Sequence, residues 1–135
     1  DFPSNLLKSH SRVITLPHLG ASTTEAEENC AIMIAEQVKD YLENGNVINS
    51  VNFPEVVMPR TEGAFRMAVV NSNVPNMLGQ ISSALAKAGL NIIDMLNKSR
   101  GELAYTLVDV DKEVPQAIVD EIAAIEGVLA VRAIG

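Results

Sequence analysis

Residues 65–90 read FRMAVVNSNVPNMLGQISSALAKAGL, and this stretch decides the fold of the chain. Phe65, Met67 and Val69 are large apolar residues spaced two apart, which is typical of a strand with one buried face. Residues 71–75 are turn formers. Apolar residues then recur at helical spacing as far as a closing glycine: Met77, Leu78, Ile81, Leu85 and Ala88. The stretch therefore predicts a strand, a turn and an amphipathic helix.

The same kinds of pattern continue toward the end of the chain. Residues 91–97 and 103–109 predict two strands joined by a hairpin turn at residues 99–101. Pro115 suits the start of a helix, which a glycine at position 127 ends. Residues 128–134 predict a last strand. The order strand, helix, strand, strand, helix, strand predicts an α+β, ferredoxin-like βαββαβ domain. Its four-stranded antiparallel sheet carries both helices on one face.

The residues before this domain predict less regular structure. Residues 12–16 form a short apolar run before a proline, which favours a buried strand. Residues 23–44 carry apolar side chains at helical spacing and predict one long helix, with Ser22 and Glu25 as a capping box. Residues 46–63 contain two prolines and predict a linker with at most one short strand.

One strand and one helix cannot bury their apolar faces alone. We therefore expect residues 1–63 to be a remnant of a larger protein plus a linker. Residues 64–135 are expected to form a domain of their own.

The composition narrows the classes of function. The chain has 135 residues, of which 47% are hydrophobic, and a formal net charge of −7. An acidic chain without basic stretches argues against binding nucleic acid or an anionic membrane. No apolar run approaches the ~20 residues needed to span a bilayer. Cys30 is the only cysteine, which suits the reducing cytoplasm. The two histidines show no metal-ligand spacing, so no metal site is expected.

Three segments together carry a family resemblance. Residues 16–23, LPHLGAST, resemble the histidine segment near the end of the catalytic part of D-2-hydroxyacid dehydrogenases. Residues 44–52, NGNVINSVN, are similar to one member of that family in particular. Residues 65–134 are similar to an ACT domain, a module that senses amino acids. In this order the segments cover nearly the whole chain, and the resemblance implies a C-terminal fragment of such an enzyme.

The resemblance implies roles for two residues near the start of the chain. His18 matches the catalytic histidine, a general acid/base opposite hydride transfer to NAD, and Gly20 matches a position near the nicotinamide. Histidine suits this role because its pKa is near neutral. The family's partner carboxylate precedes residue 1, and no G-x-G-x-x-G motif occurs. We therefore expect NAD only in the intact enzyme, no cofactor in this fragment, and no activity from it.

The resemblance also implies an effector site in the ACT domain. Asn71 and Asn73 match polar contact positions, Asn76 stands where the family usually has glycine, and Asn91 matches a further contact position. Carboxamides and a helix N-terminus suit the ammonium and carboxylate of an amino acid. L-serine is the first candidate effector. It would bind at the seam of a homodimer whose sheets meet edge to edge, with the strand before Asn71 at the edge.

Other interpretations remain open for these residues. Asn71 and Asn73 are ordinary turn residues, and Asn91 is an ordinary residue after a helix. Asn76 could crowd the effector or supply another contact, since glycine would let the backbone approach more closely. The alternative function is a structural dimerisation domain that binds no ligand.

Overall fold

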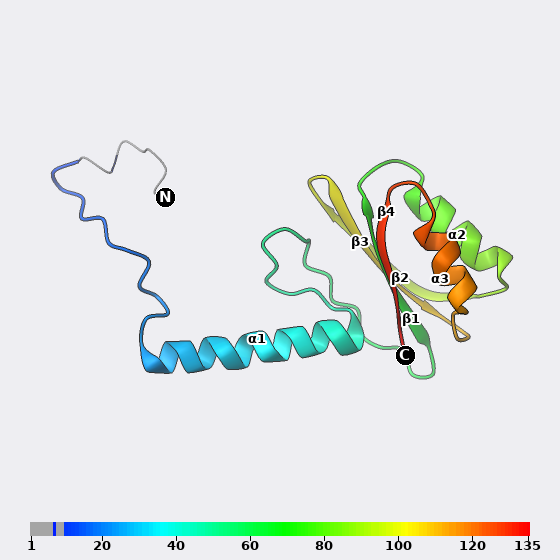
Figure 1. Cartoon of the computed structure of the whole chain (residues 1–135), viewed down its shortest axis with the longest axis horizontal. Helices are drawn as coiled ribbons and strands as arrows, with labels where there is room; N and C mark the ends of the chain where they lie inside the picture. Colours follow the sequence, from blue (N-terminus) through cyan, green and yellow to red (C-terminus); the bar gives the residue numbers. More distant parts are fainter. Residues whose placement is uncertain (1–6, 8–9) are drawn as a thin grey trace. The chain divides into compact units, whose positions relative to one another are not determined.

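The structure, a computed structural model, describes residue 7 and residues 10–135. The chain divides into two compact units, Asp1–Ala35 and Glu36–Gly135. The elements, labelled in Figure 1, are α1 (Thr24–Asn44), β1 (Phe65–Ser72), α2 (Met77–Lys87), β2 (Ile92–Arg100), β3 (Leu103–Val110), α3 (Gln116–Ala123) and β4 (Val128–Ile134).

The four strands form one antiparallel sheet in the order β2-β3-β1-β4. β1 pairs with β3 from Phe65 opposite Val110 to Ser72 opposite Leu103. Helices α2 and α3 lie on the same face of this sheet (Figure 1). The predicted ferredoxin-like βαββαβ plan is confirmed.

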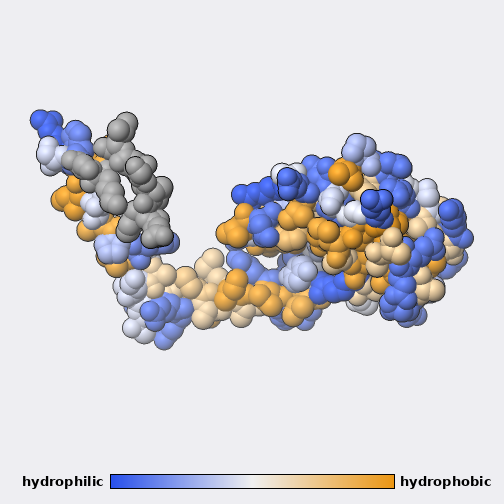
Figure 2. Space-filling view, turned by 45° about the horizontal axis from the view of Figure 1, so that its top comes forward, coloured by the Kyte–Doolittle hydropathy of each residue, from blue (hydrophilic) through white to orange (hydrophobic). Residues whose placement is uncertain are grey.

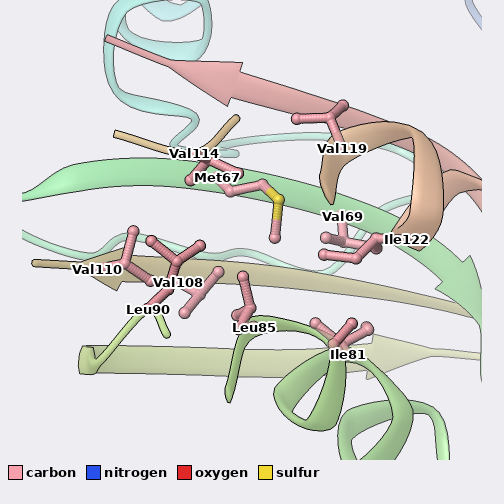
Figure 3. Packing of buried hydrophobic residues seen from close by; sticks show 11 residues of the cluster. Met67, Val69, Ile81, Leu85, Leu90, Val108, Val110, Val114, Val119 and Ile122 are labelled. Atoms are coloured by element: carbon pink, nitrogen blue, oxygen red, sulfur yellow. The ribbon is translucent and has the colours of Figure 1, made fainter. Parts of the chain in front are cut away.

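The main core lies between the sheet and the two helices. Met67 and Val69 of β1 point toward this side, as do Ile81 and Leu85 of α2 and Ile122 of α3 (Figure 3). All five side chains are fully buried. Apolar residues spaced two apart along β1 and four apart along α2 therefore pack in one aliphatic core. This shared burial is why the first segment forms a strand and the second a helix.

The opposite face of the sheet is covered by residues 45–59, which we call the strap. Its two arms meet in a short bridge, in which Val47 and Val56 exchange backbone hydrogen bonds of 2.8 and 2.9 Å. This agrees with the predicted linker containing little regular structure. A second core then forms between the strap and the sheet from Val47, Val56, Met58, Ala68, Tyr105, Leu107 and Ile134.

The strand predicted over residues 12–16 is wrong. The structure has no strand there, and Ile14 and Leu16 are exposed. A strand needs hydrogen-bonded neighbours, and among the described residues none lies alongside this segment. The predicted capping box also differs, because Thr23 accepts the capping bond from the Ala26 N–H at 3.2 Å, so the helix starts one residue after the prediction.

Helix α1 forms as predicted, but none of its residues is buried. Apolar residues lie on the surface along this helix (Figure 2). The exposed ones include Ile32, Met33, Ile34, Val38 and Leu42. Within the part of the chain that the structure describes, no helix is long and apolar enough to cross a membrane. The division at residues 63 and 64 stays a prediction, and the compact sheet unit itself starts at Glu36.

Candidate functional site

Asn71 lies near the end of β1 and is only 1% exposed. The alternation along β1 places it on the same face as Met67 and Val69, the face that carries the helices. Its Nδ2 donates to the Ser72 carbonyl at 2.7 Å. Its Oδ1 is buried and has no hydrogen-bond partner among the described residues. Buried acceptors are normally satisfied, so this oxygen marks the end of β1 as a place for a further donor.

Asn73 lies in the loop between β1 and α2, and its side chain is exposed. Its backbone N–H donates to the Glu102 carbonyl at 2.8 Å, and its Nδ2 donates to the Gly101 carbonyl at 3.0 Å. Both bonds tie the loop to the turn between β2 and β3. Asn73 is thus positioned by a neighbouring turn, and its amide oxygen has no bond within the described chain.

Asn76 precedes α2 as its N-cap and has a φ of 67°, in the left-handed region. Glycine adopts this conformation most easily and asparagine tolerates it, which explains why asparagine can stand in a glycine position. Its side chain makes no capping bond and lies against Gly79, where an added Cβ would clash with Oδ1. Asn76 lines a cavity of about 340 Å³ between α2 and α3.

A separate cleft of about 350 Å³ lies between the β1–α2 loop and the turn that joins α3 to β4. Its lining residues are Ser72, Val74, Pro75, Met77, Gln80, Glu126 and Gly127. None of the predicted residues Asn71, Asn73 and Asn76 is among them, and the side chain of Asn76 therefore does not fill this cleft. Glu126 was missed by sequence reasoning. The topology could have located it, because β4 pairs with β1 and places Val128 opposite Asn71.

Asn91 does not join the other three asparagines. It is exposed just before β2, and its N–H donates to Asp111 Oδ1 at 2.8 Å. Ile92 and Phe65 both pair with Val110, so Asn91 lies at the start of β1. Six residues of strand separate this end from Asn71, about 20 Å at the usual rise. One chain alone therefore does not form a site from all four asparagines.

The expectation that Asn71 follows an edge strand is also wrong. β1 is central, with β3 on one side and β4 on the other. The predicted ferredoxin-like plan already implies this order, and β1 is far more buried along its length than β2 or β4, as a central strand should be. The open edges of the sheet are β2 and β4.

His18 and Gly20 are exposed in a segment without regular structure. A Cβ built on Gly20 would meet nothing within 4 Å, so this glycine is not shaped around a neighbouring group. The sequence also lacks the glycine-rich turn that binds a dinucleotide pyrophosphate. These residues alone do not fit NAD. Among the described residues, no three His, Cys, Asp or Glu side chains gather as metal ligands.

The fold and the asparagine-bearing loop define the class: an α+β domain of ferredoxin-like plan, preceded by a strap and a long helix. Comparison with known proteins adds the relatives. The chain is 32% identical over 126 residues to D-3-phosphoglycerate dehydrogenase of Haemophilus influenzae, which covers 93% of this chain. It is 31% identical over 122 residues to the Escherichia coli K12 enzyme of that name. The chain is thus a homologue of D-3-phosphoglycerate dehydrogenases, and the resemblance inferred from its sequence is confirmed.

The chain spans about a third of the length of these relatives, 31% and 30% respectively. No protein-family model matches it. Solved structures with a similar arrangement include the ACT domain of a GTP pyrophosphokinase from Chlorobium tepidum, with a TM-score of 0.46, 16% identity and coverage of 54% of this chain and 99% of that chain. The regulatory subunit of aspartate kinase from Thermus thermophilus gives a TM-score of 0.43 and 15% identity, covering 52% and 49%.

Proposed function

We propose that this chain is the regulatory part of a D-3-phosphoglycerate dehydrogenase and binds a small amino acid at the β1–α2 loop. L-serine is the first candidate. The observation that carries the proposal is the cleft of about 350 Å³ beside this loop. Its volume lies at the small end of ligand pockets, which suits a small ligand.

The lining of the cleft suits the two charged groups of an amino acid. Met77 is the first residue of α2, and the first N–H groups of a helix have no partner within it. They favour a carboxylate, since the helix dipole is positive there. Glu126 lines the same cleft and offers a carboxylate to an ammonium group. Together these groups favour a zwitterion over a simple anion or cation.

A homodimer would bring Asn91 to the same end of the sheet. The outer edge of β2 is open. Two β2 strands that pair antiparallel about their middle would place Ile92 of one copy opposite Arg100 of the other. Asn91 of one copy then lies beside the β2–β3 turn of the other, the turn to which Asn73 is bonded. This pairing supports a contact between Asn91 of one copy and the loop of Asn73 in the other, on the β2 side of the cleft, whereas Glu126 lies on its β4 side.

Calorimetric titration tests the proposal. We expect L-serine to release or absorb heat on binding to the chain, and D-serine and L-alanine to bind more weakly. Glu126→Gln should weaken binding, because it removes the charge opposite the ammonium. Glu113→Gln is the matched control, since Glu113 is exposed and lies outside the cleft lining. Equal affinity of the Glu126→Gln variant would contradict the assignment of the cleft.

A structural dimerisation domain without a ligand is the second candidate. The bonds from Asn73 to Gly101 and Glu102 favour it, because they give this residue a structural role without any effector. The chain would then form dimers, and no amino acid would change its melting temperature. A bound ligand at a hundred times its Kd should stabilise by roughly 2.7 kcal/mol, which separates the two candidates.

For the longer protein we propose NAD-dependent oxidation of 3-phosphoglycerate in the cytoplasm, as part of serine biosynthesis. The similarity to enzymes of that name supports this proposal. His18 would act there as the general acid/base, with Gly20 near the nicotinamide. The 135-residue chain should not reduce NAD in the presence of 3-phosphoglycerate. Turnover by the purified chain would contradict this expectation.

A further inference from the structure

The strap is closed by its own hydrogen bonds. Besides the bridge between Val47 and Val56, Asn46 Oδ1 accepts from the Met58 N–H at 3.1 Å. These bonds join the two arms of the strap near the place where both meet the sheet. The strap therefore has the internal structure of one unit while it lies on the sheet; away from the sheet so short a bridge is marginal, and its amides become open to exchange with water.

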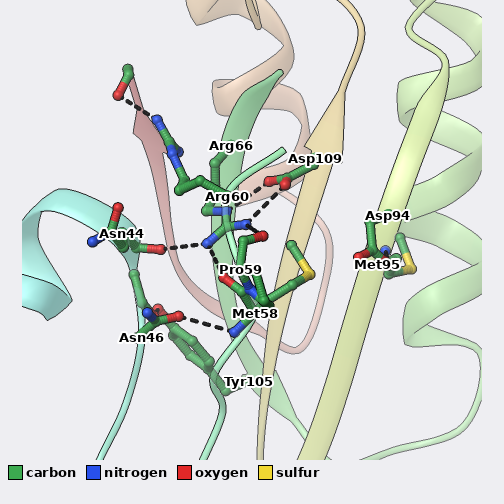
Figure 4. A network of polar contacts seen from close by, with 12 residues as sticks. Asn44, Asn46, Met58, Pro59, Arg60, Arg66, Asp94, Met95, Tyr105 and Asp109 are labelled. Atoms are coloured by element: carbon green, nitrogen blue, oxygen red, sulfur yellow. Dashed lines mark hydrogen bonds and ion pairs between the residues drawn. The ribbon is translucent and has the colours of Figure 1, made fainter. Parts of the chain in front are cut away.

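Arg66 of β1 lies between the sheet and the strap, donates hydrogen bonds to the strap, and is completely buried. Its Nε and Nη2 donate to the two carboxylate oxygens of Asp109 on β3, at 2.6 and 2.8 Å. Nη1 donates to the carbonyls of Met58 at 2.7 Å and of Asn44 at 3.0 Å. Nη2 also donates to the Pro59 carbonyl at 2.8 Å. Figure 4 shows the guanidinium among these groups.

These bonds use all five N–H groups of the guanidinium. Two bind the sheet, two bind the far end of the strap, and one binds the last residue of α1. A single side chain thus joins three segments that lie apart in the sequence. Tyr105 adds a bond from its hydroxyl to the Gly45 carbonyl at 2.7 Å, at the near end of the strap.

We propose that the strap is a latch that is held or released as one unit. Arg66 is its buried polar lock, beside the apolar contacts of the strap with the sheet and the bonds from Arg100 to the Ser50 and Phe53 carbonyls. Release of one arm alone would leave N–H groups of the buried Arg66 guanidinium without acceptors. This costs more free energy than losing the same acceptors where water can replace them. Release of the whole strap admits water to all of them. The half-released state is therefore disfavoured, and the strap has two states.

The latch also governs the end of helix α1. The Asn44 carbonyl is one of the five acceptors, and Gly45 follows it directly. When the strap leaves the sheet, the last turn of α1 loses its attachment to β1. Arg132 of β4 also donates to the Tyr41 carbonyl of α1, so release of the strap removes one of two attachments of this helix end to the sheet, whether or not an amino acid binds at the β1–α2 loop.

Hydrogen exchange on the full chain tests the latch. In the wild type, the amides of Val47, Val56 and Met58 should exchange through one common opening of the strap. The free energy of this opening should be lower than that of the opening that exposes the amides of β3. Arg66→Met should speed exchange in the strap at least about tenfold while β3 stays protected. Arg60→Met is the matched control, because Arg60 is exposed and donates only to the Gly135 carbonyl. It should leave the strap unchanged.

A second variant is needed because Arg66→Met alone leaves Asp109 buried without its partner and could unfold the whole domain. Arg66→Met combined with Asp109→Leu leaves no unpaired charge in the core, and such replacements are often tolerated. It should also speed exchange in the strap alone. Strap and β3 amides that accelerate together in the double variant, or a strap that stays as protected as in the wild type, would overturn the proposal.

Discussion

Gly45 is the residue at which helix α1 ends and the strap begins. Its φ of 73° lies in the left-handed region, where glycine is preferred. A Cβ here would stand 2.8 Å from a methyl group of Ile134 and 2.8 Å from one of Leu107. Gly45 therefore serves two needs at once, the turn that ends the helix and the close approach of the chain to the sheet.

Gly45→Ala should destabilise the sheet unit. The left-handed conformation costs an alanine about 1–2 kcal/mol, and overpacking against the sheet adds about 1–3 kcal/mol. Urea unfolding followed by circular dichroism measures the loss. Gly89→Ala is a control at the end of α2, since its φ is 70° but a Cβ there meets nothing within 4 Å. A loss no larger than that of the control would show that the close approach does not matter.

Tyr105 should make the stability depend on pH in the alkaline range. Burial raises the pKa of its hydroxyl well above the ordinary value of 10.0, with Tyr41 adding to the rise and Arg132 and Arg66 opposing it. The folded state thus keeps the proton where the unfolded state loses it. This stability is fully present below pH 10 and is lost as pH rises above it.

Tyr105→Phe should remove this part of the alkaline loss. At pH 7 the variant should be less stable by about 1–3 kcal/mol, because the Gly45 carbonyl loses its donor. The difference between variant and wild type should shrink as pH rises above 10. Urea unfolding at pH 7, 9 and 10.5 measures it, and a constant difference would contradict the assignment to Tyr105.

At the scale of elements, the spacing of apolar residues and the positions of glycine and proline predicted every helix and strand of the sheet domain. Local patterns sufficed because each element has one buried face against a common core. The strand at residues 12–16 failed, since an apolar run alone does not supply a neighbour. From the sequence, Arg66 is expected to face solvent between apolar residues, and its burial depends on a strap seven residues or more away. The separation of Asn91 from Asn71 depends on strand direction, because β1 and β2 both run antiparallel to β3, so the residue before β2 lies at the start of β1.

The start of α2 offers a test of the glycine position. Asn76→Gly should leave stability nearly unchanged, within about 1 kcal/mol, because glycine adopts a φ of 67° without strain but adds freedom to the unfolded chain. The variant removes only the side chain that lies against Gly79. Thermal unfolding measures the stability. Because Asn76 does not line the proposed cleft, calorimetric titration with L-serine should give the same affinity as the wild type, and tighter binding would show that its side chain crowds the effector.

At the scale of the whole molecule, the sheet has two covered faces and two open edges. Helices α2 and α3 cover one face, and the strap covers the opposite one. The edges β2 and β4 remain, and unpaired edges invite pairing with another chain. Assembly of copies through the sheet is therefore directed to its edges.

Mixing two variants tests whether the site is shared between copies. Both residues lie outside the lining of the cleft in one chain, so a shared site requires that Asn73→Ala and Asn91→Ala each weaken L-serine binding in a homodimer. If Asn73 of one copy meets Asn91 of the other, a mixed dimer has one intact site and one that lacks both. The exchanged mixture should then regain binding at about a quarter of all sites, since half the dimers are mixed and each has one of two sites intact. A mixture that stays inactive after subunit exchange would contradict a shared site.

The burial of Arg66 and Asp109 has a consequence for ionic strength. Ion pairs at a surface weaken as salt screens them, with a screening length of about 8 Å at physiological salt, whereas buried pairs are screened far less. Arg66 and Asp109 are 0% and 1% exposed. The attachment of the strap should thus hold in dilute buffer and in concentrated salt alike. A change in the salt concentration around the protein would therefore not weaken the contact between the strap and the sheet.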